Sequence, residues 1–189
     1  INNEGCMVNR ELTEDGLKNF ATNTLGLYIF TTGPIPVLKR HDPRMKTVSS
    51  DRMLVQKLNT NDLQSRTAFN GTVVYAQNRR QQVVLSQQWP QRPGIHFSFM
   101  RPGWVDIPAR LYHCEAVHAR LKGRLCAVAL GVDTILRLVL PVATVQPSGL
   151  FFQDQKSAPT HLPLARTSSS PAEEEKLTEI LEELAQRFK

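Results

Sequence analysis

Residues 72–89, TVVYAQNRRQQVVLSQQW, contain two apolar runs on either side of a polar segment. The runs at 72–77 and 82–89 are rich in valine, and NRRQ at 78–81 separates them. β-Branched side chains favour strands, and asparagine is common where the chain turns. This pattern predicts a β-hairpin with Asn78 in its turn.

Similar short runs lie on both sides of this segment. Two Pro-Gly pairs bracket IHFSF, and a Lys-Gly turn at 122–123 separates two more runs. Such spacing is typical of short strands joined by turns. The predicted fold class is α+β and β-dominated, with about six or seven short strands in an antiparallel sheet or a partly open barrel. Besides the hairpin, strands are expected at 25–30, 95–99, 109–121, 124–131 and 134–142.

One or two short N-terminal helices complete this expectation. Thr13 is a helix cap, and the acidic residues after it suit the first turn of a helix that reaches Ala21. Three prolines make 31–43 a loop or an extended edge, and the basic run at 39–46 is also expected in a loop. Residues 50–58 predict a helix capped by Ser50, with a strand as the alternative.

The C-terminal residues 171–189 predict an amphipathic helix. Ser170 is expected to cap it, Pro171 to take the first helical position, and Glu173 to complete a capping box. A helix of this length is marginal alone in water, so its apolar stripe must be buried. The stripe docks either on a partner, as a partner-binding site, or back on the chain's own sheet. It consists of Leu177, Ile180, Leu181, Leu184 and Phe188.

Composition divides the chain into four parts. Residues 1–12 are polar and expected to be flexible, and 13–152 are expected to form the β-rich globular domain. A Pro/Ser-rich linker at 153–170 leads to the C-terminal helix at 171–189. Apolar residues make up 41% and charged residues 21%, which describes an ordinary globular chain with a long polar segment.

Compartment is weakly constrained by the sequence. No stretch offers the roughly 20 uninterrupted apolar residues of a membrane span, so none is expected. The three cysteines have no spacing typical of a disulfide framework, which favours a reducing, intracellular compartment. A leader removed before Ile1 stays an open alternative.

Charge is distributed unevenly along the chain. The formal net charge is +6, although residues 171–189 hold six Glu against three Lys or Arg. The strongly basic remainder favours a polyanionic partner such as nucleic acid, with aromatic side chains such as Trp89 and Trp104 as stacking platforms. The interpretation that we favour over this is that the aromatic residues are core and the charges keep strand edges soluble. The candidate nucleic-acid-binding residues are Lys39, Arg40, Arg44, Lys46, Arg79 and Arg80.

The segment YHCEAVHARLKGRLC, residues 112–126, is the most suggestive of metal chemistry. His113 and Cys114 are adjacent, so on a strand they point to opposite faces and cannot both reach one ion. Cys114 and His118 share a face but lie about 13 Å apart along a strand. We therefore expect no metal site at His113, Cys114, His118 and Cys126, and interpret the cysteines as small core residues.

No motif in the sequence names a reaction. The sequence lacks a dinucleotide fingerprint, a phosphate-binding loop, a Gly-x-Ser-x-Gly elbow and a His-Glu-x-x-His pair. No cofactor is therefore expected, and an enzyme is less favoured than a binding protein. A small enzyme would need a pocket lined by residues such as His96, His113 or Glu115.

Architecture gives the functional hypothesis that the sequence favours most. A β-rich body, a linker and one acidic amphipathic helix suggest a non-enzymatic interaction or assembly subunit with a protein partner or self-association. A nucleic-acid-binding module that uses Arg-rich loops and exposed aromatics is the alternative. An enzyme without a recognisable motif is third.

Overall fold

The computed structural model describes residues 1–14, 16–38, 43–67, 69–91, 94–106, 119, 121, 123–140 and 146–188. Its centre is a four-stranded sheet in the order β3-β4-β5-β6. The neighbouring pairs β3–β4 and β4–β5 are parallel, and only β6 runs antiparallel. The strands are β3 (Arg44–Val48), β4 (His96–Met100), β5 (Leu150–Gln153) and β6 (Lys156–Ser157).

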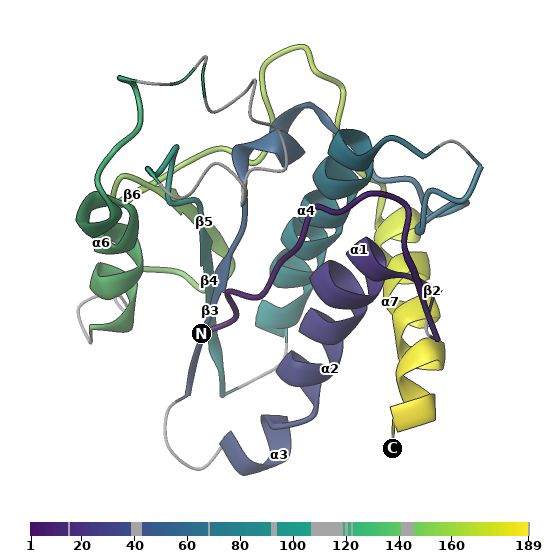
Figure 1. Ribbon diagram of the computed structural model, residues 1–189. Helices are drawn as coiled ribbons and strands as arrows, with labels where there is room; N and C mark the ends of the chain where they lie inside the picture. The colour runs from purple at the N-terminus through teal and green to yellow at the C-terminus, as the bar shows by residue number, and fades with distance from the viewer. Residues whose placement is uncertain are drawn as a thin grey trace.

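Helices cover both faces of this sheet, as Figure 1 shows. The long helix α4 (Gly71–Gln88) connects β3 to β4, and α6 (Val128–Val139) lies between β4 and β5 in the chain. In Figure 1, α1, α2, α4 and α7 lie on one side of the sheet and α6 lies on the other. The fold is therefore a layered α/β arrangement, as a parallel sheet requires.

The remaining elements are short. The segments α1 (Lys18–Phe20), a π-helical segment (Ala21–Gly26) and α2 (Leu27–Thr32) follow one another without a break. A two-residue pair, β1 (Leu12–Thr13) with β2 (Gly16–Leu17), precedes them, and α3 (Ile35–Leu38) follows. Single 3₁₀ turns are η2 (Asp51–Val55), η3 (Trp89–Gln91) and η6 (Gln186–Phe188), the last directly after α7 (Pro171–Ala185).

The predicted fold class, a β-dominated antiparallel sheet or barrel, is wrong. Parallel neighbours cannot be joined by tight hairpins and need a long crossover, which helices supply here. The predicted hairpin at 72–89 is replaced by α4, and Asn70 caps the helix by accepting hydrogen bonds from the backbone N–H groups of Thr72 and Val73. Burial of both its apolar and its polar sides hides the amphipathic period that usually identifies a helix.

Two further predicted strands are also helices. Residues 25–30 lie in the helical run that ends at Thr32, and 134–139 belong to α6. Of the strand expected at 124–131, Cys126 forms an isolated bridge with Val105 and the residues from Val128 onward are helical. Most of the strand expected at 109–121 lies outside the described residues.

Other local predictions are confirmed. The strand predicted at 95–99 is β4. Of the helix predicted at 50–58, the Ser50 cap is present, but only Asp51–Val55 are helical, and they form a 3₁₀ turn. The C-terminal helix begins where its signals place it, with both hydrogen bonds of the Ser170–Glu173 capping box present.

Two N-terminal predictions differ from the structure. Strand β3 was expected only as part of a loop, and the helix predicted from Thr13 begins at Lys18.

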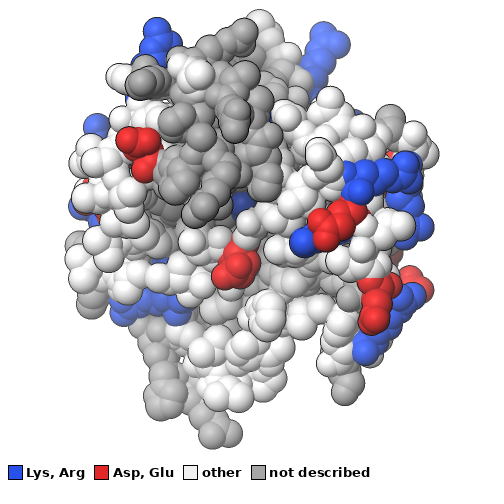
Figure 2. Space-filling view, in the orientation of Figure 1, with Lys and Arg blue, Asp and Glu red and all other residues white. Residues whose placement is uncertain are grey.

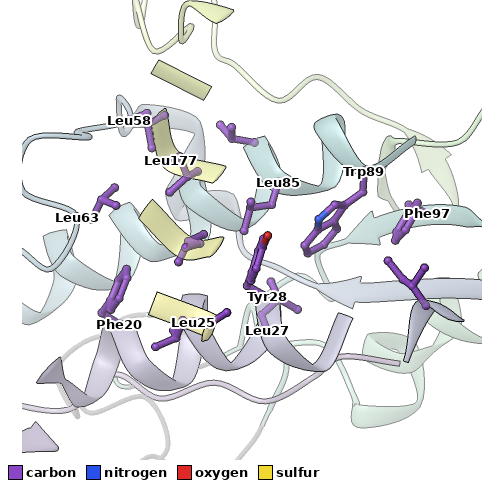
Figure 3. Close-up of a cluster of buried hydrophobic side chains, with 14 of the residues drawn as sticks. Phe20, Leu25, Leu27, Tyr28, Leu58, Leu63, Leu85, Trp89, Phe97 and Leu177 are labelled. Atoms are coloured by element: carbon purple, nitrogen blue, oxygen red, sulfur yellow. The ribbon is translucent and has the colours of Figure 1, made fainter. Parts of the chain in front are cut away.

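The main core lies between the sheet and the helices on one side of it. Phe20, Leu25 and Tyr28 come from the first helical run, and Leu85 and Trp89 come from α4 and the turn after it. Figure 3 shows these side chains in one cluster that also contains Leu177 of α7. The C-terminal helix is therefore part of the chain's own core.

The segment that leads to this helix also packs on the body. The backbone oxygen of Thr160 and the hydroxyl of Thr167 accept hydrogen bonds from Arg80 of α4, and Thr167 is buried. At the other end of the chain, Asn2 forms a parallel bridge with Thr47 of β3. Across the ranges described, none of the helices has the length and apolar character needed to cross a membrane.

Helix α7 docks in cis, which decides between the two alternatives that the sequence left open. Leu177 and Leu181 are fully buried against α2, the π-helical segment and α4, whereas Phe188 is half exposed. Ile180 and Leu184 pack against the same core as partly buried side chains.

We expect Leu181→Asp to lower the free energy of unfolding by about 3 kcal/mol or more, because it places a charge in an apolar site. Chemical denaturation followed by circular dichroism measures this loss. The matched control is Phe188→Asp at the exposed end of the same stripe, with an expected change below about 1 kcal/mol. Equal effects of the two substitutions would contradict docking in cis.

Candidate active site

A cavity of about 440 Å³ opens where the parallel strands β3 and β4 end. Its walls include Ser49 to Arg52, which follow β3, and Arg101 to Trp104, which follow β4. In open α/β sheets, ligands bind outside the carboxyl ends of the strands. The position of the cavity therefore identifies it as the candidate functional site.

Helix α4 contributes two side chains to this cavity, Tyr75 and Arg79. They are four residues apart, so they lie on one face of the helix, and the Arg79 guanidinium carbon is 4.8 Å from the centre of the Tyr75 ring. Arg79 is buried and donates to the backbone oxygen of Val48 at 3.0 Å and to Gln82 Oε1 at 2.9 Å. The cation is thus fixed beside the aromatic ring at the end of β3.

Ser49 lines the same cavity from the end of β3. Its backbone N–H donates to the carbonyl oxygen of Met100 at 2.7 Å, which continues the pairing with β4 by one residue. The side chain is only 4% exposed, and its hydroxyl oxygen has no hydrogen-bond partner among the described residues. An unpartnered buried hydroxyl costs free energy, so it is available to a ligand atom that enters the cavity.

The N-terminal segment also lines the cavity, with residues 5–7, and two asparagines hold it in place. Asn23, from the π-helical segment, accepts a hydrogen bond from the N–H of Cys6 and donates to its carbonyl oxygen, both at 2.8 Å. Asn19 makes the same pair of bonds with Val8 at 2.9 Å. Asn19 and Asn23 are four helical residues apart, a rise of about 6 Å, and Cys6 and Val8 are two extended residues apart, about 6.6 Å. The spacing of the asparagines therefore matches that of the two residues they bind.

Close packing at Gly5 completes this wall. A Cβ atom at Gly5 would collide with the guanidinium of Arg79 and come 3.3 Å from the amide oxygen of Asn23. A side chain at position 5 would therefore displace the guanidinium of Arg79 from its present position. The π-helical geometry at Asn23 also belongs to this region, and such segments are frequent at functional sites.

The predicted nucleic-acid-binding residues are not brought together on one surface. Arg79 and Arg80 are buried in α4, and Lys46 is 1% exposed in β3, so these three present no charge to a phosphate backbone. Arg44 precedes Lys46 on β3, and Lys39 and Arg40 lie outside the described residues. On the face seen in Figure 2, the coloured basic side chains lie in separate groups, some of them beside acidic ones.

The metal prediction is tested only in part. Within the ranges described, no group of three or more His, Cys, Asp or Glu side chains could hold an ion. His113, Cys114 and His118 lie outside those ranges, as does Glu115, so the expectation of no site at 112–126 stays a prediction. His96 lies in β4, where its Nε2 is 2.9 Å from the backbone oxygen of Gln146, and it does not line the cavity.

Comparison with known proteins adds information on function. The chain is 70% identical over 195 residues to dehydrogenase/reductase SDR family member 12 of Bos taurus and 67% identical to the protein of that name in Homo sapiens. Both matches cover the whole chain, which spans 62% of the length of each relative. Polyprenol dehydrogenase of Homo sapiens is 36% identical over 137 residues, 65% of this chain and 42% of that protein. No family model matches.

A solved structure supports the fold. The crystal structure of an uncharacterized protein from Mycobacterium paratuberculosis superposes with a TM-score of 0.73 at 18% identity. The match covers 97% of this chain and 64% of that chain. The chain therefore has a Rossmann-like α/β fold.

These findings correct the functional predictions. The non-enzymatic interaction or assembly subunit is wrong, as are the nucleic-acid-binding alternative and the preference against an enzyme, because the relatives at 70% and 67% identity are named dehydrogenase/reductases. The sequence interpretation missed Ser49, Tyr75 and Arg79 as a site. Tyr75 and Arg79 have helical spacing, but the hairpin interpretation placed them on a strand and at a turn.

Lys46 is one of the three basic residues that were predicted to bind nucleic acid and are buried instead. Its ammonium group donates to the hydroxyl of Ser98 at 3.1 Å and lies 3.3 Å from Nδ1 of His96. Burial lowers the pKa of Lys46 from 10.5 to about 8, and the like charge of Arg44 adds to the shift. The unfolded chain therefore binds more protons than the folded chain between pH 8 and 10.5.

Stability should accordingly rise with pH through this window. We expect Lys46→Met to raise the free energy of unfolding at pH 7 by about 1–3 kcal/mol, because it removes the cost of burying the charge. The advantage over the unsubstituted chain should shrink between pH 8 and 10.5. Urea denaturation over this range checks it, with exposed Lys57→Met as control. A pH-independent difference would contradict the buried charge.

Proposed function

We propose that this chain carries the proton-transfer site of an oxidoreductase that interconverts an alcohol and a carbonyl compound. The observation that carries the proposal is the cavity in which Tyr75, Arg79 and the unpartnered Ser49 hydroxyl meet. The names of the relatives at 70% and 67% identity, dehydrogenase/reductases, support the reaction class. Polyprenol dehydrogenase acts, by its name, on an alcohol.

The side chains divide the work of carbonyl reduction as follows. Ser49 donates a hydrogen bond to the substrate oxygen and holds it toward Tyr75. The Tyr75 hydroxyl gives its proton to that oxygen as negative charge develops there, and takes it back in alcohol oxidation. The Arg79 guanidinium stabilises the negative charge left on the phenolic oxygen, and Val48 and Gln82 fix its position.

The second half of the reaction needs a hydride carrier. A nicotinamide dinucleotide supplies or accepts the hydride in such reactions, which no amino-acid side chain can do. The described residues fit the reacting end of such a cofactor, because the buried Nε–H of Arg79 has no hydrogen-bond partner among them and is free to donate to a hydroxyl group. The sequence has no glycine-rich phosphate loop, so the residues present do not account for binding the dinucleotide as a whole.

We expect Tyr75→Phe to reduce kcat for aldehyde or ketone reduction by about 10²–10⁴, because it removes the proton donor and leaves the cavity shape intact. The assay follows oxidation of reduced nicotinamide cofactor by the purified full chain with a panel of aldehydes and ketones.

Tyr28→Phe is the matched control. It removes a hydroxyl that donates to Glu182 Oε2 at 2.8 Å, outside the cavity, and should leave kcat unchanged. Equal turnover by Tyr75→Phe and the unsubstituted chain would contradict the role of Tyr75. If calorimetry shows that the chain binds the reduced cofactor, the absence of cofactor-dependent turnover with every compound in the panel would contradict the proposed reaction.

A further inference from the structure

The cavity is lined by two arginines that the proposed proton transfer does not use. Three arginines line the cavity, namely Arg52, Arg79 and Arg101, against one acidic residue, Asp51. Arg79 lies within the site already assigned to the reaction. Arg52 and Arg101 come from the loops that follow β3 and β4, and the assigned reaction gives them no role.

Arg101 is only partly neutralised by its neighbour. Its Nη1 donates to Asp51 Oδ2 at 2.5 Å, and both side chains keep some exposure, at 17% and 28%. Its Nε–H is buried and has no hydrogen-bond partner among the described residues. A guanidinium binds an oxyanion best through two parallel N–H groups, and the contact with Asp51 uses only Nη1, which leaves the Nε–H unpaired.

Arg52 is held without an acid. Its guanidinium carbon lies 5.8 Å from the centre of the Trp104 ring, within the range of a cation–π contact. In the ranges described, its guanidinium forms no ion pair. Stacking on an aromatic face uses the plane of the guanidinium and leaves the N–H donors at its edge free.

The positive wall continues beyond the cavity. Residues Arg101 to Trp104 also border a second depression of about 630 Å³. Its other walls carry three more basic side chains, Arg124, Arg137 and Lys156, against two acidic ones, Asp133 and Asp154. The cavity and the adjoining depression therefore share a wall, and the residues that line each of them carry an excess of positive charge.

We propose that Arg52 and Arg101 form an oxyanion-binding subsite at the rim of the cavity. Stacked Arg52 and the free Nε–H of Arg101 would bind a carboxylate or a phosphate on a molecule whose reacting carbon lies near Tyr75. The oxyanion comes either from the substrate or from the diphosphate of a nucleotide cofactor. The proposal rests on the cavity assigned above, but it concerns binding and holds or fails without reference to turnover.

The test compares matched anionic and neutral ligands. Calorimetric titration of the full chain uses 4-formylbenzoate against its neutral methyl ester, and ADP against adenosine. We expect the anionic member of at least one pair to bind about tenfold tighter than the neutral one, and this preference to weaken as salt rises. Preference in the first pair identifies the substrate as the source, and preference in the second identifies the nucleotide.

Variants connect the preference to the subsite. Arg52→Gln should remove most of it, and Arg52→Lys should restore only part, because lysine keeps the charge but lacks the two-pronged guanidinium. Arg66→Gln, which replaces an exposed arginine outside the cavity, is the control and should leave it intact. Thermal melting checks that each variant folds. Equal affinity within both pairs, or an anion preference that survives Arg52→Gln, would overturn the proposal.

Discussion

The buried polar contacts of helix α4 are the feature on which the rest of the structure depends. Six consecutive polar residues, 77–82, are buried in the middle of this helix, where an apolar surface would be the usual solution. Arg80 illustrates the reason. It donates to the backbone oxygens of Met53, Gln56 and Thr160 at 2.7–2.9 Å, so one side chain connects the helix to two segments, the η2 turn with the residue after it and the chain at Thr160.

The same helix binds the first helical run from its other side. Gln82 donates to the backbone oxygen of Asn23 at 2.6 Å, and the hydroxyl of Thr24 donates to Gln81 Oε1 at 2.7 Å. Burial lowers the pKa of Arg80 to about 10, so the guanidinium remains charged at neutral pH and depends on carbonyl dipoles for its solvation. Because these contacts fix the rotation of α4, they also fix which face presents Tyr75 and Arg79 to the cavity.

The sequence predicted the parts of the fold that are settled locally. The capping box at Ser170 and the stripe around Leu181 depend on nearby residues only, and both are present in the structure. Helix α4 could not be recognised in this way, because its polar residues 77–82 are buried along with its apolar ones, and the sequence shows no division into an apolar and a polar face. Its valines favoured strands, and on a strand Tyr75 and Arg79 would not lie side by side. The hairpin interpretation therefore did not recognise them as a pair.

The candidate site was out of reach for a related reason. The sheet order brings together residues that are far apart in the chain, such as Ser49 and Arg101, only when β3 and β4 pair in parallel. An interpretation built on antiparallel strands joined by tight turns cannot place the two strand ends at one edge. The unpartnered Ser49 hydroxyl becomes visible only with three-dimensional contacts.

The free energy of unfolding of Arg80→Met tests most directly whether the buried polar contacts of α4 hold the fold together. The substitution keeps an apolar chain in the space but removes the hydrogen bonds to three backbone oxygens. The oxygen of Met53 still accepts from the N–H of Gln56, so the part-buried oxygens of Gln56 and Thr160 lose their donor, at about 1–3 kcal/mol each. The account predicts a loss of at least about 3 kcal/mol in urea denaturation, a partial recovery in Arg80→Lys, and little change in the exposed control Arg66→Met. Unfolding of Arg80→Met at the same urea concentration as the unsubstituted chain would contradict it.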